Sequence, residues 1–449
     1  MDLKQKRLLI GVSQSALSEI SGIAQHRLSA FELNKKIPTN EEKKCILSSL
    51  ENPELVSKVK NRKKRVVKNV QNFIPPKKRS YVKSAANDDY LDEIQSLFKK
   101  HKNNNKKFSG LSFFSGCGGF SLGASAAGIK IEGFCEIDDG IQKIYKSNFK
   151  NVKSLTSDIS KITEKELECF GRNNIDIFIG GPPCQGFSLS GKRDVNDPRN
   201  RLFEDYLKIV NTVKPKIVFL ENVSLLLTMR DGEGNLVKES IVKAFEDSGY
   251  SCDFYVVNAA EYGVPQNRRR VFFVGVDKDL KKGFEFPETD YGDQDLFNSK
   301  KPLRSFQDAC SDLPFIESGQ NSDIDFHFSV NHPKHVCEWL FDVKQGKSAH
   351  DNKDPKMRPP SGYNTTYKRQ FWKKPSSTIQ TTFGMISGSN NVHPICTRAL
   401  TIREAARLQS FPDEFKFSKK IGVTRTAIGN AVPPLLAYKI IKKVLIQIL

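Results

Sequence analysis

The sequence of 449 residues contains no long hydrophobic run. Its longest apolar stretches, such as 217–220 and 271–276, have the length of strands, whereas a membrane-spanning helix needs about 20 apolar residues. The first residues, MDLKQKRLLIGVSQ, lack the apolar core and small-residue cleavage site of a secretory signal. These absences predict a soluble, cytoplasmic protein.

Cysteine is too sparse and too scattered for a disulfide framework. The nine cysteines are an odd number and include no CxxC pair. His332, His335 and Cys337 lie close in sequence, but a fourth ligand and a zinc-type spacing are missing. We therefore expect a reducing compartment and no bound metal.

Acidic residues are fewer than basic residues. Lys and Arg number 71 against 51 Asp and Glu, for a net charge of +20, which predicts an anionic partner such as nucleic acid. Half of the excess falls in residues 51–107, which hold sixteen basic and six acidic residues. We interpret 51–107 as a basic flexible linker with a short helix around 89–100.

Hydrophobic residues make up 38% of the chain, enough for a core, and from residue 108 they form short runs. Helix-like segments such as 203–213 and 239–248 separate runs rich in Ile, Val and Phe. This alternation predicts a parallel sheet covered on both faces, with ligands at the carboxyl ends of the strands. The candidate strands are FSGLSFF, IKIEGFCEI, NIDIFIGG, PKIVFLEN and RRRVFFVGV.

The first run ends in a glycine-rich loop, Phe-Ser-Gly-Cys-Gly-Gly-Phe at 114–120. Such a loop before a helix lets a ligand approach the backbone, although Ser121 replaces the third glycine of the dinucleotide fingerprint. Glu136, 20 residues past Gly116, is placed to accept hydrogen bonds from ribose hydroxyls. Asp158 follows in a third loop, within reach of an adenine amino group. Together they suggest an adenosine-containing ligand without a pyrophosphate requirement.

Three further strand ends carry reactive side chains. Cys184 lies in the loop Pro-Pro-Cys-Gln-Gly after NIDIFIGG, a stiff setting for a nucleophile. Glu221 ends PKIVFLEN and is a candidate proton donor to a ring nitrogen. In an extended segment Gln266, Arg268 and Arg270 share one side and are expected to line one pocket.

The chain resembles cytosine-C5 DNA methyltransferases of the bacterial restriction–modification type. Their motifs occur in order as Phe-Ser-Gly-Cys-Gly-Gly, Gly-Pro-Pro-Cys-Gln-Gly-Phe-Ser, Phe-Leu-Glu-Asn-Val, Gln-Asn-Arg-Arg-Arg and Ile-Gly-Asn-Ala-Val. The segment RALTIREAARLQSFPDEF at 398–415 resembles the penultimate motif of the family. The resemblance implies a doubly wound, mostly parallel α/β sheet of the S-adenosylmethionine-dependent methyltransferase type.

The resemblance also implies a mechanism. The Cys184 thiolate would add to C6 of a flipped-out cytosine, so that C5 takes a methyl group from S-adenosyl-L-methionine. Glu221 would hold the base and protonate N3. Arg268 would bind the base carbonyl or a phosphate, Arg270 would order Cys184 and Glu221, and Gln266 would contact DNA. The implied donor site comprises Phe114, Gly116, Gly118, Gly119, Glu136, Ile137, Asp158, Ile159, Pro183, Leu202, Asn430 and Val432.

Domain boundaries follow from the same motifs. Residues 108–276 form the predicted catalytic domain and 398–449 return to it, while 277–397, without an α/β pattern, form a smaller target-recognition domain. A cognate restriction endonuclease is expected in the same system, without implied contact.

Residues 1–50 have helix-turn-helix organisation of the kind found in phage and bacterial repressors. Ser13 is the predicted cap of a first helix, Ser21-Gly22 the turn, and 24–32 the second helix, with a further helix after Thr39. The module resembles an all-α DNA-binding domain, is small enough to need dimerisation on an operator, and suggests an autoregulator. Its predicted DNA contacts are Gln25, His26, Arg27 and Ser29.

Three other interpretations are compatible with parts of the sequence. RNA cytosine-C5 methylation uses the same chemistry, but the recognition-sized insert and the N-terminal module favour DNA. A regulator with a vestigial methylase domain is disfavoured by the intact Cys184, Glu221, Arg268 and Asn430. A nicotinamide-dependent oxidoreductase is disfavoured by Ser121.

Overall fold

The computed structural model describes residues 3–32, 36–57, 83–103, 105–171, 174–183, 202–230, 234–292 and 300–449. The chain divides into two compact units, Met1–Lys78 and Arg79–Leu449. None of the described helices is long and apolar enough to cross a membrane.

The first unit is helical, and its helix ends lie where the capping residues predict them. The Ser13 side chain accepts a hydrogen bond from the amide of Ala16, and the helix that follows ends at Gly22, whose φ is +69°. Thr39 forms a capping box with Glu42. The described helices are α1 (Leu3–Ile10), α2 (Gln14–Ser21), α3 (Gln25–Glu32) and α4 (Asn40–Glu51).

The small core of this unit is made by Leu17, Leu28, Phe31 and Ile46, together with Val56 beyond α4. A buried ion pair, Arg7 Nε to Glu32 Oε1 at 2.6 Å, ties α1 to α3. Because Val56 belongs to the core, the unit extends past the boundary predicted at residue 50.

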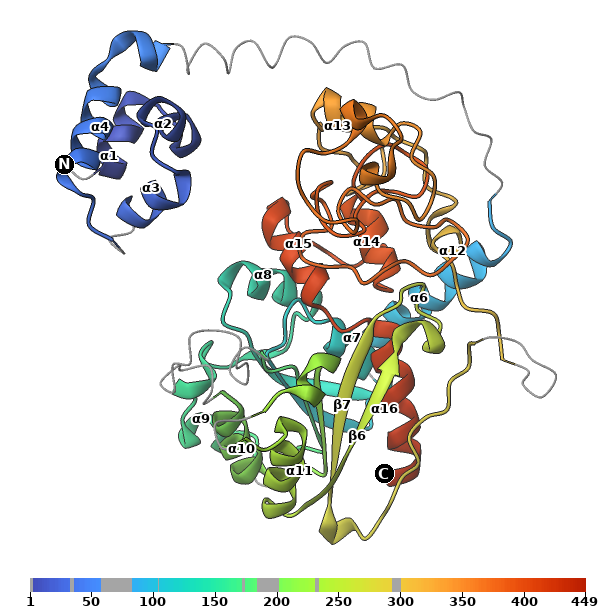
Figure 1. Cartoon of the computed structure of the whole chain (residues 1–449). Helices are drawn as coiled ribbons and strands as arrows, with labels where there is room; N and C mark the ends of the chain where they lie inside the picture. Colours follow the sequence, from blue (N-terminus) through green and yellow to red (C-terminus); the bar gives the residue numbers. More distant parts are fainter. Residues whose placement is uncertain are drawn as a thin grey trace. The chain divides into compact units, whose positions relative to one another are not determined.

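The second unit contains a seven-stranded sheet in the order β3-β2-β1-β4-β5-β7-β6 (Figure 1). Five strands, β1 to β5, are parallel, as predicted, whereas β7 pairs antiparallel with both β5 and β6. The predicted strands are all present, and the sequence analysis missed β3 and β6. The bounds are β1 (Phe108–Phe113), β2 (Ile129–Cys135), β3 (Lys153–Ser154), β4 (Ile177–Gly180), β5 (Ile217–Val223), β6 (Tyr250–Asn258) and β7 (Arg269–Asp277).

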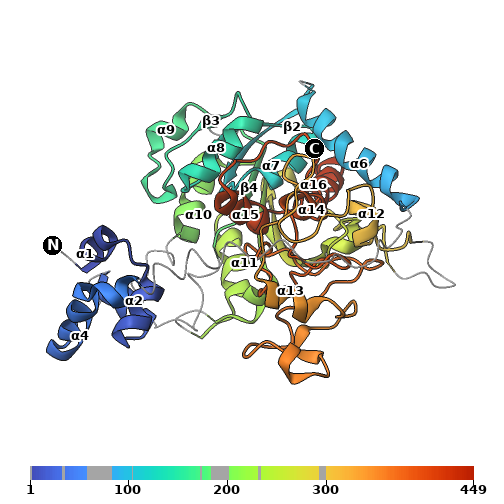
Figure 2. The same ribbon diagram turned by 90° about the horizontal axis from the view of Figure 1, so that it is seen from above.

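Both faces of the sheet are buried, because successive residues of the central strands point to opposite cores. Ile217 and Phe219 of β5 enter one core, and Val218 and Leu220 enter the other. Helix α16 packs against α7 on the first face, as both views show (Figures 1 and 2). The first face is covered by α6 (Ala86–Lys102), α7 (Gly119–Ala126), α8 (Asp139–Asn148) and α16 (Pro434–Ile448), and the second by α9 (Glu164–Glu168), α10 (Leu202–Val213) and α11 (Val237–Asp247).

Helix α6 corrects the predicted linker. A helix was expected near 89–100, but as part of a tether; instead, Tyr90, Ile94 and Leu97 are buried in the first core. The helix therefore belongs to the catalytic unit, and the predicted linker 51–107 is shortened at both ends. Residues 58–82 lie outside the described part.

The predicted recognition region, 277–397, contains little regular structure. Its described helices are α12 (Phe306–Cys310) and α13 (Lys334–Leu340), with 3₁₀ turns η6 (Lys278–Leu280), η7 (Ala349–Asp351) and η8 (Pro355–Met357). Viewed from above, α13 protrudes from the sheet (Figure 2). After this region, α14 (Ile402–Leu408), α15 (Ile421–Asn430) and α16 return to the catalytic part, as predicted.

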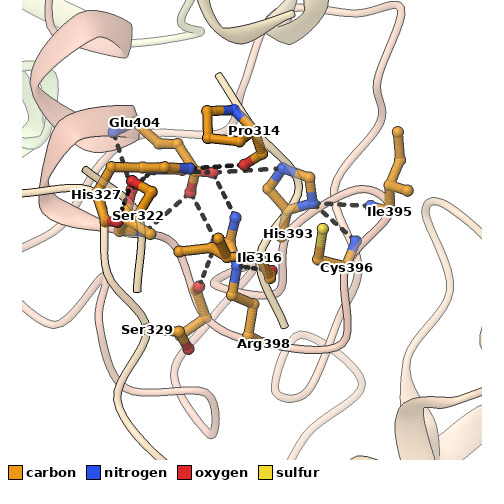
Figure 3. Close-up of polar contacts among 12 residues, drawn as sticks. Pro314, Ile316, Ser322, His327, Ser329, His393, Ile395, Cys396, Arg398 and Glu404 are labelled. Carbon is orange, nitrogen blue, oxygen red and sulfur yellow. Dashed lines mark hydrogen bonds and ion pairs between the residues drawn. The ribbon is translucent and has the colours of Figure 1, made fainter. Parts of the chain in front are cut away.

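Buried polar side chains join this region to α14 (Figure 3). Arg398 donates to both carboxylate oxygens of Glu404, at 2.8 and 2.6 Å, and to the carbonyl of Ile316. Burial disfavours the charge on Glu404, but attraction to Arg398 outweighs it and holds the pKa of Glu404 well below its usual range. His393 lies 3.5 Å from the same carboxylate. The pair therefore anchors α14 to the loops around it.

Candidate active site

The loop from β1 to α7 places backbone atoms that no side chain covers at the carboxyl edge of the sheet. Phe114 (φ +50°) and Gly116 (φ +55°) take left-handed conformations, and apart from its chain neighbours no described residue has an atom within 4 Å of the position of a Cβ on Gly116. The amide of Gly116 donates to Oε2 of Glu136 at 2.8 Å. Phe114 and Gly116 line a cavity, as predicted for ligand-binding residues.

The next two glycines serve packing rather than the cavity. A Cβ on Gly118 would lie 2.4 Å from the ring of Phe149, and one on Gly119 would lie 2.4 Å from the carbonyl oxygen of Val432. Gly118, Gly119 and Val432 are not among the described residues that line the cavity, and their predicted donor contacts stay predictions. They let the C-terminal segment approach the glycine-rich loop.

The end of β2 supplies an acid and an apolar surface. Burial raises the pKa of Glu136, although backbone amides of Asp138 and Gly116 donate to its carboxylate. Ile137 follows, 71% exposed, and both residues line the cavity. Asp158 does not: its carboxylate accepts hydrogen bonds from the amide and hydroxyl of Ser160, while its neighbours Ser157 and Ile159 line the wall.

Glu221 stands on β5 beside an arginine from the antiparallel strand β7. The pairing places Val223 opposite Arg270, and Arg270 Nε lies 2.9 Å from Glu221 Oε1. The side-chain Nδ2 of Asn222 donates to the carbonyl of Pro182, which fixes the start of the loop after β4. Pro183 also lines the cavity. Cys184, the predicted nucleophile, lies outside the described residues.

Arg268 is fully buried and lines the cavity. Its guanidinium donates to the carbonyls of Ile379 at 3.2 Å and Gly429 at 3.0 Å, and its Nε has no hydrogen-bond partner among the described residues. Burial, with the nearby charge of Arg270, lowers the pKa of Arg268 well below its ordinary value. Such a buried donor at a cavity wall is poised for a ligand acceptor.

Gln266 does not share this pocket. It is fully buried, and its amide bonds to Leu408, Gln409 and Ile379. The prediction that Gln266 contacts DNA is therefore wrong for this arrangement, because every polar atom of the side chain is used internally.

One cavity of about 480 Å³ joins these elements. It brings together eleven of the predicted site residues: Phe114, Gly116, Glu136, Ile137, Ile159, Pro183, Leu202, Glu221, Arg268, Arg270 and Asn430. The sequence analysis assigned no role to Asn222 or Gly429, which also contribute. Both lie inside the quoted motifs, next to the predicted residues Glu221 and Asn430. This adjacency in sequence could have identified them.

Fold and site together define a doubly wound enzyme that binds its ligands at the strand ends. Residues 108–445 match the family model of the C-5 cytosine-specific DNA methylases, and the chain belongs to this family. The predicted family and fold are thereby confirmed, and the chain is a DNA (cytosine-5-)-methyltransferase. The first 107 residues lie outside the match.

Curated relatives agree with this assignment. Type II methyltransferase M1.HphI of Haemophilus parahaemolyticus is 36% identical over 75% of this chain and 86% of its own. Type II methyltransferase M.Sau96I of Staphylococcus aureus is 34% identical over 80% of each chain. A crystal structure described as a candidate DNA modification methyltransferase encoded within an E. coli prophage has a TM-score of 0.60 and 25% identity, covering 76% of this chain and 99% of its own.

Proposed function

We propose that the cavity binds S-adenosyl-L-methionine beside a cytosine flipped out of duplex DNA, within a specific sequence. The observation that carries the proposal is the convergence of Glu221, Arg270 and Arg268 with the wall formed by Gly116 and Glu136. The volume of about 480 Å³ falls within the usual range of small-molecule sites, roughly 300–1,000 Å³.

The residues present fit an adenosyl donor. Open space above Gly116 admits a close backbone contact, Glu136 offers carboxylate oxygens to ribose hydroxyls, and exposed Ile137 offers an apolar surface to the purine. Asn430 lies at the end of α15, where it closes the pocket from the C-terminal segment. When bound, the donor supplies an electrophilic methyl group.

The side chains on the other side suit the activation of cytosine. The thiolate of Cys184 would add to C6, and the electron pair of the C5–C6 double bond would form the new bond from C5 to the methyl group, whose bond to the donor sulfur breaks so that S-adenosylhomocysteine leaves. Loss of the C5 proton and cleavage of the bond between sulfur and C6 then release the product. Glu221, held by Arg270, binds the base and protonates N3, and the free Nε of Arg268 is available to the base carbonyl.

We further infer that the enzyme is the modification component of a type II restriction–modification system, as the names of its relatives suggest. A cognate endonuclease in the same system follows from this role and requires no contact with the chain.

A second proposal concerns the first unit. Helices α2 and α3, joined at Gly22 and packed through Leu17 and Leu28, favour a helix-turn-helix module that binds operator DNA as a dimer. Ser29 is partly exposed on α3, and Arg27 is half exposed in an ion pair with Glu42. The side chains of Gln25 and His26 lie outside the described part.

The methylation proposal is tested with tritiated methyl donor and a mixed DNA library, followed by bisulfite sequencing. We expect label at C5 of cytosine within one short sequence. No label on DNA, from a folded protein that binds the donor, would favour an RNA substrate. Failure to bind the donor would instead favour the regulator interpretation.

A further inference from the structure

Two buried glutamine side chains, those of Gln266 and Gln409, form a hydrogen bond outside the cavity of the candidate active site. Nε2 of Gln266, at the approach to β7, donates to Oε1 of Gln409, just after α14, at 3.0 Å. Both side chains are fully buried. Neither lines the cavity, so neither is explained by contact with substrate.

The first glutamine binds the end of the recognition region. Its Oε1 accepts from the amide of Ile379 at 2.9 Å, and its Nε2 also donates to the carbonyl of Leu408 at 3.0 Å. Gln266 further pairs with Ser376 in an isolated parallel β-bridge. The segment 376–379 is thereby held against the strand-end loop that carries Arg268.

The second glutamine binds the C-terminal end of helix α15, which forms part of the cavity wall. Nε2 of Gln409 donates to the carbonyl of Ile428 at 2.7 Å. Two residues further along the chain is Asn430, which lines the cavity. The two side-chain amides thus connect the segment 376–379 of the recognition region to the end of α15.

Arg268 connects the same two segments from the cavity side, through the carbonyls of Ile379 and Gly429. The contact is close, because a Cβ on Gly429 would lie 2.4 Å from the amide nitrogen of Thr381. Neither backbone can move without disturbing the other, since buried polar groups are costly to leave unpaired.

We propose that Gln409 and Gln266 are positioning residues that couple recognition of DNA to binding of the methyl donor. A duplex that binds segment 376–381 restricts the movement of Ile379. Through the hydrogen-bonded side chains of Gln266 and Gln409, this restriction extends to Gly429 and Asn430 at the end of α15. Linkage requires the effect to be reciprocal, so bound donor also tightens DNA binding. The inference rests on the proposed donor and DNA sites.

The test measures the dissociation constant of S-adenosylhomocysteine, which cannot react, by calorimetry with and without a duplex containing the methylated sequence. The full-length protein and its Gln409→Met variant are compared. In the wild type we expect DNA to tighten binding by a factor in the usual range of coupling, about 5–150-fold. In the variant we expect the ratio of the dissociation constants without and with DNA to fall to about one. The dissociation constant measured without DNA should change by a smaller factor.

Gln370→Met is the matched control. Gln370 is a buried glutamine of the same region. Its side chain also bonds two backbone groups, the carbonyl of Asn390 and the N–H of Ser377, but it has no hydrogen bond to α15 among the described residues. We expect its coupling factor to match the wild type. Gln266→Met cuts the same connection from the other side and replaces Gln409→Met if that variant fails to fold.

The possible results separate the two proposals. A wild type that binds both ligands without coupling, or a Gln409→Met variant that keeps the wild-type factor, overturns the inference. Equal loss in Gln370→Met also overturns it, because a general weakening of the region would then be sufficient. A folded wild type that binds neither ligand contradicts the proposed function itself.

Discussion

The seven-stranded sheet and residues 277–397 satisfy their backbone groups in different ways. In the sheet, neighbouring strands bond to each other, and alternating apolar side chains fill the two cores. In the recognition region, side chains replace the missing ladder: Arg369 donates to five carbonyl oxygens, those of Leu340, Val343, His393, Ile395 and Cys396.

The difference affects how each region responds to substitution. Sheet stability is distributed over many apolar contacts, so that the cost of one truncation depends on the size of the side chain removed and of the cavity left. The recognition region depends on a few buried polar side chains, and removal of one leaves several backbone groups unpaired. The proposed catalytic residues lie on the sheet, and target recognition is proposed for the region that depends on buried polar side chains.

The largest expected effect separates chemistry from recognition. Cys184→Ser replaces the proposed thiolate with a hydroxyl that is not ionised at neutral pH, so we expect methyl transfer to fall at least about 10³-fold. Binding to duplex DNA should stay close to wild type, because recognition is assigned to residues 277–397. Single-turnover transfer of tritiated methyl and a filter-binding assay measure the two. Turnover within tenfold of wild type would contradict covalent catalysis.

The next effect tests whether the buried charges of Arg398 and Glu404 stabilise the attachment of the recognition region to α14. Arg398→Met leaves Glu404 buried and without its main partner, which should cost about 3–5 kcal/mol of unfolding free energy. Both tryptophans, Trp339 and Trp372, belong to this region, so their fluorescence during urea unfolding reports on it.

The matched control for Arg398→Met is Lys243→Met, which removes an exposed ion pair on α11. There we expect a loss below about 0.5 kcal/mol. If the two variants shift the fluorescence transition equally, the recognition region does not depend on its buried charges.

Acid should weaken both regions through one neutral histidine each. Burial lowers the pKa of His101, on α6, to about 4, and that of His332, which accepts from the amide of Ala399, also to about 4. The unfolded chain binds these protons near pH 6.5, so stability is complete above that pH and declines toward pH 4. We expect roughly 2–3 kcal/mol from each histidine.

Urea unfolding at pH 7 and pH 5 measures this decline, with circular dichroism following the sheet and fluorescence the recognition region. His101→Gln should flatten the pH dependence of the first signal and His332→Gln that of the second. A wild type with equal stability at both pH values would show that these imidazoles are not kept neutral by burial.

The same contrast explains what the sequence revealed. The central strands and the site residues at their ends were predictable, because apolar periodicity places each loop at a known edge of the sheet. Glu221 beside Arg270 does not follow from that logic, because Arg270 begins its strand and reaches Glu221 only through the antiparallel pairing of β7 with β5. The packing roles of Gly118, Gly119 and Val432 did not follow, since a glycine required by a neighbouring ring has the same local pattern as one required by a ligand.

The recognition region gave no such periodicity, and its organisation depends on contacts between residues far apart in the chain. Arg369 and the buried Gln266 look in sequence like ordinary surface polar residues. Only the folded backbone shows that their partners are carbonyls and amides from distant loops. Helix α6 was assigned to a tether for a related reason: the charge of the surrounding segment obscured Tyr90, Ile94 and Leu97.

The smallest effect on methylation is expected from removal of the first unit. Deletion of residues 1–60 removes α1 to α4 and the core residue Val56, all outside the compact unit that carries the active site. Methylation of the recognised sequence should change less than about twofold, while binding to the DNA upstream of the gene itself, measured by gel shift, should be lost. Arg27→Ala combined with Ser29→Ala keeps the helices and should reproduce only the loss of operator binding. A collapse of methylation in the deletion would instead place the N-terminal helices within the catalytic machinery.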